Sequence, residues 1–385
     1  MTRLLLENAI LLDPEASGPV PGRLLVENGR ILGRPGPDEV PGGAELVDLA
    51  GQHLAPGFID LHHHGRLVFS EPESYGSVLS ATAASFLRHG TTGFLPTTLA
   101  WQKQELMTRV RALVRVMEPV NDAATPLGIH LEGPWIRAAA RGAQPSAGIR
   151  PFSRPEAESL LDAAEGRVRM VTLAPEIQGA EELQALLSRR RVVAALGHSL
   201  ADDACVMRAI DRGASHVTHL FNAMGPLHHR QPGLAGVALA DDRLSCDLIC
   251  DGVHVHPAMV RLAARAKGEG LVLITDRLDP GPLGPSGETA SFGSGQVRDD
   301  GSALRLADGT LAGSNLTLDR ALRNALEWGG LSLLEAVAAC TLRPARLLGI
   351  ESEHGTLRPG ARADLVVLDE AGSVRQTWLA GRRVY

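Results

Sequence analysis

Short apolar runs alternate with amphipathic helical patterns through the middle of this 385-residue chain. Eight apolar runs can be counted, and they lie at residues 58–61, 92–95, 127–131, 169–173, 192–196, 216–220, 245–250 and 271–275. The helical patterns between them include residues 101–117, 154–164, 180–188, 201–212 and 257–266. This alternation is typical of a parallel α/β fold, because parallel strands need long crossovers that are usually helical. Eight such units predict a (β/α)8 TIM barrel, whose chemistry lies at the C-terminal ends of its strands.

The two ends of the chain have a different pattern. Residues 1–54 contain short β-rich runs separated by turns rich in glycine, proline and aspartate. Residues 351–385 add two further runs, ADLVVLD and SVRQTWLAGRRVY, with the same turn chemistry. Because chain termini often lie close together, we expect residues 1–54 and 351–385 to form one small β-sandwich beside a barrel at residues 55–350.

Three consecutive histidines follow the first apolar run of the centre, in the stretch PGFIDLHHHG at residues 56–65. Side chains on a strand alternate between its two faces, so His62 and His64 point to one side and His63 to the other. Two imidazoles on one face make half of a metal site. Histidine clusters also occur on ordinary surfaces, but this one ends a run that reads as a buried strand.

The C-terminal ends of the other predicted strands are rich in residues that bind metals. They supply Glu132, His198, His219, Asp251, His254 and Asp276. Taken singly, a buried histidine is more often a hydrogen-bonded core residue, and an acid after a strand is often a helix N-cap. Taken together, they indicate a set of nitrogen and oxygen ligands with an open position, as in catalytic Zn²⁺ sites. A carboxylate on the last strand, Asp276, is well placed to act as a general base.

Composition narrows the class of protein and its partners. With 44% hydrophobic and 21% charged residues, the chain is large enough for a barrel and a smaller domain. A formal net charge of -6 and the lack of a basic run argue against a nucleic-acid partner. No secretory signal can be drawn, because Glu7, Asn8 and Asp13 interrupt the apolar start, and no run is long enough to span a membrane. We therefore expect a cytoplasmic protein.

Cysteine usage does not suggest a disulfide framework. The four cysteines, Cys205, Cys246, Cys250 and Cys340, are too few and too scattered for one in a chain of this length. Cys246 and Cys250 could share a strand face as metal ligands. Buried core thiols are the better interpretation.

Seven segments in order carry a family resemblance: APGFIDLHHHG, HLEGPW, VTLAPE, LGHS, VTHLFNAM, DGVHVHP and LAGSNLTLD. They resemble the amidohydrolase superfamily and, within it, the N-acetylglucosamine-6-phosphate deacetylases, over about residues 54 to 345. The first segment is specific only to the superfamily, whereas HLEGP with VTLAPE, THLFNAM and the LAGS loop is specific to the deacetylases. The C-terminal GTLRPGARADLVVLD resembles the β-sandwich that the superfamily shares.

The resemblance implies roles for individual residues. A divalent metal, expected to be zinc, would be held by Glu132, His198 and His219, with Asp276 as the catalytic acid and base and a second metal on His62 and His64. The substrate would be an amino sugar phosphate, and the protein would be a homodimer. Its substrate contacts would come from Ala143, Gln144, Asn222, Ala223, Arg230, Asp251, His254, Leu311, Ala312 and Gly313. The guanidinium of Arg230 suits a phosphate, although it also reads as an ordinary surface arginine.

The implied reaction is hydrolysis of the N-acetyl group of N-acetyl-D-glucosamine 6-phosphate to D-glucosamine 6-phosphate and acetate. Two departures from the family pattern bear on it: Gln144 stands where relatives usually have histidine near the acetamide, and Arg277 stands where they have a small residue after the strand-8 aspartate. Arg277 either pairs with Asp279 or lies beside Asp276, where its charge would weaken Asp276 as a base. Either departure could mark a change in acyl or sugar preference.

Three other functions remain to be weighed. One is a deacylase of a related sugar such as N-acetylgalactosamine 6-phosphate, and another is a barrel that binds sugar phosphate without turning it over. The third is a cyclic-amide hydrolase, which would usually need a metal-bridging lysine from strand 4. The two lysines of this chain, Lys103 and Lys267, fall on helical patterns instead, which disfavours that third function.

Overall fold

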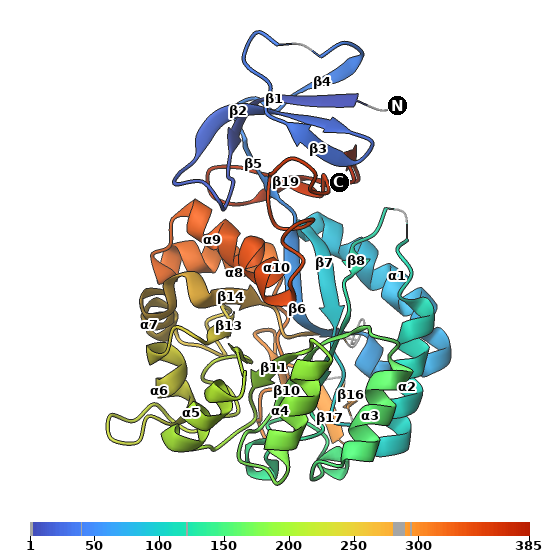
Figure 1. Cartoon of the computed structure of the whole chain (residues 1–385), viewed down its shortest axis with the longest axis vertical. Helices are drawn as coiled ribbons and strands as arrows, with labels where there is room; N and C mark the ends of the chain where they lie inside the picture. Colours follow the sequence, from blue (N-terminus) through green and yellow to red (C-terminus); the bar gives the residue numbers. More distant parts are fainter. Residues whose placement is uncertain (1–2, 40, 121, 280–288, 293–294) are drawn as a thin grey trace.

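Both ends of the chain contribute to one sheet. The computed structural model describes residues 3–39, 41–120, 122–279, 289–292 and 295–385, and Figure 1 shows this sheet at one end of the molecule, with both termini on it. Its strand order is β21-β20-β19-β5-β1-β2-β3, and β4 pairs with β1. The strands are β1 (Arg3–Leu11), β2 (Val20–Glu27), β3 (Arg30–Gly33), β4 (Ala44–Asp48), β5 (His53–Pro56), β19 (Leu365–Leu368), β20 (Val374–Leu379) and β21 (Arg382–Arg383).

The sheet joins the chain ends through backbone pairing, side-chain contacts and an apolar cluster of its own. Strand β19 pairs antiparallel with β5, so that Val367 lies opposite Leu54. Both side chains are buried in a cluster distinct from the main core, together with residues such as Leu6, Leu24 and Trp378. The connection between β1 and β2 also contacts the C-terminal segment, since Thr356 and Arg358 both donate hydrogen bonds to the carboxylate of Glu15.

The body of the molecule is built on parallel strands. Strands β9 to β14 form a six-stranded sheet in chain order, and β15, β6, β7 and β8 form a second sheet. They are β6 (Phe58–Gly65), β7 (Thr91–Pro96), β8 (Thr125–Pro126), β9 (Ile129–Glu132), β10 (Val168–Leu173), β11 (Val193–Leu196), β12 (His216–Val217), β13 (Ser245–Ile249), β14 (Leu271–Ile274) and β15 (Arg277–Leu278). Each of the eight predicted apolar runs contains one of these strands or at least half of one.

The two parallel sheets meet at both margins. A single bridge between Thr97 and His130 links the end of β7 to β9. At the other margin, the backbone nitrogen of Asp276 after β14 donates to the backbone oxygen of His62 in β6, at 2.9 Å. The strands therefore form a curled parallel sheet whose C-terminal strand ends face one another.

Helices cover the outside of this curled sheet (Figure 1). They are α1 (Tyr75–Phe86), α2 (Lys103–Val116), α3 (Arg154–Ala163), α4 (Ala180–Arg189), α5 (Asp203–Asp211), α6 (Gly233–Ala240), α7 (Pro257–Lys267), α8 (Leu318–Asn324), α9 (Leu333–Cys340) and α10 (Leu342–Leu348). The five predicted helical patterns correspond to α2, α3, α4, α5 and α7. The other five helices were not predicted. The sequence of α6, GLAGVALA, illustrates the reason: without polar residues on one face, it lacks the alternation of apolar and polar positions that identifies an amphipathic helix.

A small antiparallel sheet lies between β15 and α8, and the sequence patterns did not predict it. Its strands are β16 (Thr289–Phe292), β17 (Gly295–Asp299) and β18 (Leu304–Leu306). The chain that follows β18 returns along it, since Arg305 and Leu311 form a further bridge. Within the described residues, no helix has the length and apolar character that crossing a membrane requires.

Candidate active site

Strand β6 presents its histidines to two different environments, as the alternation of strand side chains predicts. The Nε2 atoms of His62 and His64 lie 3.2 Å apart on one face. On the other face, the His63 ring packs against Phe86 with 4.5 Å between ring centroids, and its Nδ1 lies 3.3 Å from the hydroxyl of Thr275. The alternation of side chains along β6 therefore separates the polar pair His62 and His64 from His63, which packs between the strand and a helix.

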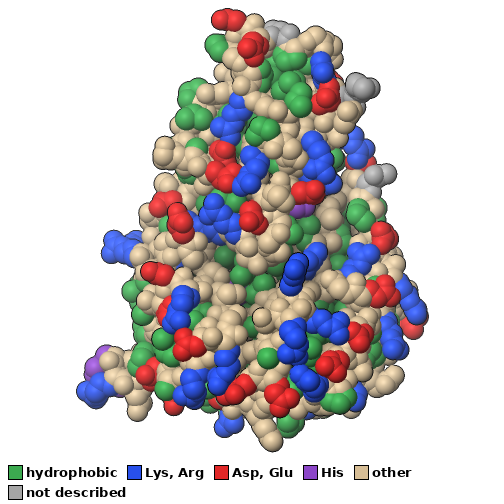
Figure 2. All heavy atoms as spheres, in the orientation of Figure 1, with side chains coloured by type: hydrophobic (Ala, Val, Ile, Leu, Met, Phe, Trp, Pro, Cys, Tyr) green, Lys and Arg blue, Asp and Glu red, His purple; other side chains and the backbone are tan. Residues whose placement is uncertain are grey.

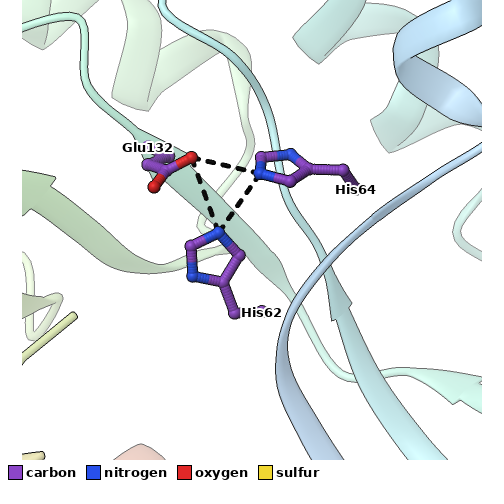
Figure 3. Close-up of side chains that lie close together, drawn as sticks. All are labelled: His62, His64 and Glu132. Atoms are coloured by element: carbon purple, nitrogen blue, oxygen red, sulfur yellow. Dashed lines mark hydrogen bonds and ion pairs between the residues drawn. The ribbon is translucent and has the colours of Figure 1, made fainter. Parts of the chain in front are cut away.

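Glu132, the last residue of β9, lies between two pairs of histidines. Its Oε1 is 2.9 Å from Nε2 of His198 and 3.0 Å from Nε2 of His219. Its Oε2 is 3.1 Å from Nε2 of His64 and 3.5 Å from Nε2 of His62, and Figure 3 shows this second group converging from β6 and β9. Within each group of three, the ligand atoms lie within 4.8 Å of one another. Both groups predicted from the sequence are thus brought together, and they share one carboxylate.

The hydrogen bonds on the far side of two rings show that this donor set fits metal ions. Nδ1 of His64 faces the carbonyl oxygen of Thr97 at 3.1 Å, and Nδ1 of His198 faces that of Ala140 at 2.9 Å. A carbonyl oxygen only accepts, so each Nδ1 carries the proton, and in the neutral ring Nε2 then presents a lone pair. Those lone pairs point at the carboxylate of Glu132. At such distances each imidazole nitrogen and the carboxylate oxygen need a proton or a metal ion between them, and this arrangement of backbone carbonyl, imidazole and cation is usual around metals.

The pKa shifts of the site residues also indicate that the site favours positive charge. Burial alone would raise the pKa of Asp276, but the charge of His62 and the hydrogen bond from His64 lower it to about 2. Burial alone would lower the pKa of His64, but its hydrogen bonds to Asp276 and Glu132 raise it to about 10. In the same way, the charge of His62 and its other imidazole neighbours hold the pKa of Glu132 well below its usual range against the effect of burial. Two buried carboxylates therefore draw positive charge into this site.

Three of the side chains enter the site from unusual backbone conformations. His198, His219 and Asp276 are each the second residue after β11, β12 and β14, and their φ angles are 47°, 33° and 46°. Residues other than glycine rarely adopt this left-handed region, because the Cβ atom crowds the backbone. Here the sharp turn at each strand end directs a side chain toward Glu132 instead of onward into the following loop.

The site opens into a cavity of about 280 Å³. Thirteen of the sixteen site residues expected from the sequence line it: His64, Glu132, Ala143, Gln144, His198, His219, Asn222, Ala223, His254, Asp276, Leu311, Ala312 and Gly313. His62 is fully buried beneath the site. Asp251 lies behind His254, with its Oδ2 2.7 Å from Nδ1 of that ring.

Arg230 lies away from the cavity, on the surface of the molecule. It belongs to the loop before α6, which projects from the body of the molecule (Figure 1). His228 and His229 precede it and are also exposed, and histidine and basic side chains gather at the tip of this projection in Figure 2. Within one chain, the structure does not bring Arg230 to the other site residues.

The charge of Asp279, one of the two partners considered from the sequence, acts on Arg277, whose guanidinium is also bonded to the main chain. Its guanidinium donates to the carbonyl oxygens of Asn315 and Leu316. Burial lowers its pKa, and the charge of Asp279 opposes that effect. The side chain lines a separate cavity of about 150 Å³ on the His63 side of β6. Arg277 is thus held by backbone carbonyls on the opposite side of the strand from the metal ligands.

Sequence reasoning missed several residues that line the main cavity: Leu99, Gly142, Phe221, Phe292 and Thr310. Phe221 lies within the segment VTHLFNAM and Gly142 precedes Ala143, so the signal for both was their position beside expected site residues. Phe292 and Thr310 come from β16 and from the chain after β18, where no pattern had predicted strands.

Known proteins resemble this chain in sequence and in fold. The model of the amidohydrolase family matches residues 53–384. The N-acetylglucosamine-6-phosphate deacetylase of Bos taurus is 40% identical over 353 residues, which cover 89% of this chain and 85% of that protein. The N-acetylgalactosamine-6-phosphate deacetylase of Escherichia coli O157:H7 is 36% identical over 329 residues, covering 86% and 87%. A mutant N-acetyl-D-glucosamine-6-phosphate deacetylase from Mycobacterium smegmatis, solved with N-acetyl-D-glucosamine-6-phosphate, matches with a TM-score of 0.90 and 34% identity over 100% of both chains.

Proposed function

The chain belongs to the amidohydrolase family, and on that basis we propose that it removes the acetyl group of N-acetyl-D-glucosamine 6-phosphate by metal-dependent hydrolysis. The products are D-glucosamine 6-phosphate and acetate. The observation that carries the proposal is the carboxylate of Asp276 beside two histidine groups that share Glu132, with every one of these residues except the buried His62 lining one cavity. Relatives that are 40% identical over most of the chain bear the name of this activity.

The residues around Glu132 have the donor chemistry for divalent metal. Glu132, His198 and His219 would hold one ion through one oxygen and two nitrogens, and His62 and His64 with the other oxygen of Glu132 would hold a second. This mixture of imidazole and carboxylate donors suits Zn²⁺. A bound ion would lower the pKa of a water molecule and polarise the acetamide carbonyl.

Asp276 is the residue placed to move the proton. Its Oδ1 lies 3.4 Å from Nε2 of His64 and 3.5 Å from that of His62, at the edge of the ligand set and on the cavity wall. As a carboxylate it accepts a proton from the attacking water. It then donates that proton to the nitrogen of the amide, so that the amine leaves as the carbon–nitrogen bond breaks.

The remaining cavity residues would bind the sugar and its phosphate. Ala143, Asn222, Ala223 and residues 311–313 line the wall around the metal ligands, and His254 lines the same cavity farther along. Arg230 is exposed on a projecting loop, so we propose that it reaches the phosphate of a neighbouring subunit in a homodimer. A guanidinium suits that role because its parallel N–H groups match the oxygens of a phosphate.

We also propose that the curled sheet is a closed (β/α)8 barrel spanning residues 55–350, and that residues 1–54 and 351–385 form one β-sandwich domain. The backbone bond between Asp276 and His62 and the bridge between Thr97 and His130 support closure at both margins. The pairing of β19 with β5 supports a shared terminal domain. A cytoplasmic location stays a prediction.

A deacetylation screen tests the proposed function. Metal-replete protein would be given N-acetylated glucosamine and galactosamine, each with and without the 6-phosphate, and acetate release would be measured. We expect N-acetyl-D-glucosamine 6-phosphate to give the highest kcat/KM. A higher value for the galactosamine compound would assign the chain to that specificity instead. Binding of the phosphorylated sugars without any acetate release would indicate a sugar-phosphate-binding barrel.

A further inference from the structure

Gln144 uses both polar atoms of its side chain on the protein. Its Oε1 accepts from the backbone nitrogen of Ala100 at 2.7 Å, and its Nε2 donates to Oε2 of Glu132. The two amide atoms can be told apart, because a backbone N–H only donates and a carboxylate oxygen only accepts. The side chain is only 4% exposed. Gln144 therefore links the main chain at Ala100 to the carboxylate that the two histidine groups share.

The segment that carries Gln144 is anchored along its length. The backbone nitrogen of Gln144 donates to the oxygen of Arg141 at 2.9 Å, and the Arg141 guanidinium donates back to the oxygen of Gln144 at 3.1 Å. Farther on, a Cβ atom at Gly148 would lie 1.7 Å from the backbone oxygen of Ala100, so only glycine permits this close approach. Gln144 is thus held from both sides against the chain segment that it bonds.

From these contacts we infer that Gln144 is a positioning residue for Glu132 and so sets the affinity of the site for metal. The Glu132 carboxylate can rotate about its last bond, and that rotation decides whether the plane of the carboxylate directs one oxygen at each pair of histidines. A donor fixed on Oε2 stops the rotation while leaving Oε1 to His198 and His219. Because the amide is neutral, it orients the carboxylate without adding a positive charge that would compete with a cation.

This role differs from a contact with the acetamide of the substrate. For Gln144 to donate to a bound acyl group, it would have to release Glu132 or Ala100, and either release leaves a buried polar group without its partner. The inference rests on the proposed function only through the shared metal ligands and does not involve the sugar. It can therefore be tested in the absence of substrate.

The test measures metal affinity in three purified variants. Gln144→Leu removes the amide, and Gln144→Asn keeps it but is one methylene too short to span from Ala100 to Glu132. Gln184→Leu is the matched control, since Gln184 is equally buried and donates to the oxygen of Ala209 on the outer helices. Competition with a chromophoric chelator for Zn²⁺ gives the affinity, and circular dichroism checks the fold.

Both Gln144 variants are expected to lose about tenfold to 100-fold in metal affinity, which is the usual effect of removing a partner that orients a ligand. The control should bind as the wild type does. At saturating metal, the KM for N-acetyl-D-glucosamine 6-phosphate should change less than about threefold, because a residue that only orients Glu132 is not a substrate contact. Wild-type metal affinity in either folded variant would overturn the inference, as would a large rise in KM with metal affinity unchanged. Gln144-dependent metal binding in a protein that releases no acetate would instead refute the proposed function alone.

Discussion

His254 is held by Asp251, three residues earlier, through contacts to both carboxylate oxygens. Nδ1 of the His254 ring lies 2.7 Å from Oδ2 of Asp251, and the backbone nitrogens of Val253 and His254 each donate to Oδ1 at 2.8 Å. Burial would raise the pKa of Asp251, but the hydrogen bond and charge of His254 and the two backbone hydrogen bonds together outweigh burial and lower the pKa. Asp251 is therefore an ionised residue that folds the loop and orients the ring on the cavity wall.

Asp251→Asn should impair binding of the phosphorylated sugar more than turnover. The neutral amide cannot match the charge-assisted bond to the ring, so His254 loses its fixed orientation. We expect KM for N-acetyl-D-glucosamine 6-phosphate to rise about tenfold, or roughly 1.4 kcal/mol, with kcat within about threefold of wild type. Steady-state kinetics would measure both constants, with Asp203→Asn as the control variant because Asp203 is an exposed acid on α5. Unchanged KM would remove His254 from the binding site.

His219→Ala should remove bound metal and activity together. The substitution deletes one of three ligands in the group with Glu132 and His198, where the nitrogen and oxygen donors converge from different strands. Elemental analysis after exhaustive dialysis is the measurement, and His53→Ala in β5 is the control because it lies in the terminal sheet. Wild-type metal content in the His219 variant would show that this group is not the tight site.

Asp276→Asn should leave the fold and most of the metal in place while lowering kcat by at least about 10²-fold, the usual scale for a lost general acid and base. Asparagine keeps the shape of the side chain and tolerates the positive φ of this position better than most residues. Stopped assays of acetate release, with metal content measured on the same sample, would check this. Near-normal turnover would place the proton transfer on another group.

Arg230→Ala should erase most of the preference for the phosphorylated over the free sugar if the proposed dimer forms. In one chain Arg230 is exposed and lies outside the cavity, so its effect requires a neighbouring subunit. The ratio of kcat/KM for the two sugars would be compared with that of Arg265→Ala, an exposed arginine on α7. Light scattering supplies the second reading, because a monomer with full activity contradicts the proposal.

Lowering the pH should weaken the link between the two chain ends. Burial would raise the pKa of Glu15 from its ordinary value of 4.5, but the hydrogen bonds from Thr356 and Arg358 lower it. Since the folded pKa is the lower one, this contribution is complete above about pH 4.5 and is lost as the pH falls through the folded pKa. For an exposed pair it amounts to about 0.2–1 kcal/mol.

Thermal unfolding of the wild type and of Glu15→Gln between pH 7 and pH 3 would test the link. The difference in Tm between the two proteins should be largest near neutral pH and should shrink toward zero in acid. A difference that stays constant over this range would show that the carboxylate charge of Glu15 contributes nothing to the link.

The parts of the fold and site that follow a period or a motif were predictable from the sequence. The alternation in β6 predicted that His62 and His64 share a face, and the apolar runs located the parallel strands. The helix α6 escaped prediction because it is apolar on all sides, and β16 to β18 because short strands with polar, glycine-rich turns leave a weak signal. The hydrogen bonds that join Ala100, Gln144 and Glu132 connect residues far apart in the sequence. They depend on the tertiary structure, which no local sequence pattern predicts.

The left-handed backbone at His198, His219 and Asp276 has a consequence for the stability of this chain. Each such conformation destabilises the fold by about 1–3 kcal/mol relative to a relaxed one, and glycine or asparagine would relieve much of that strain. Folding alone would therefore favour replacement at these three turns. Two histidines and an aspartate therefore occupy these turns for the chemistry of their side chains and at the expense of stability.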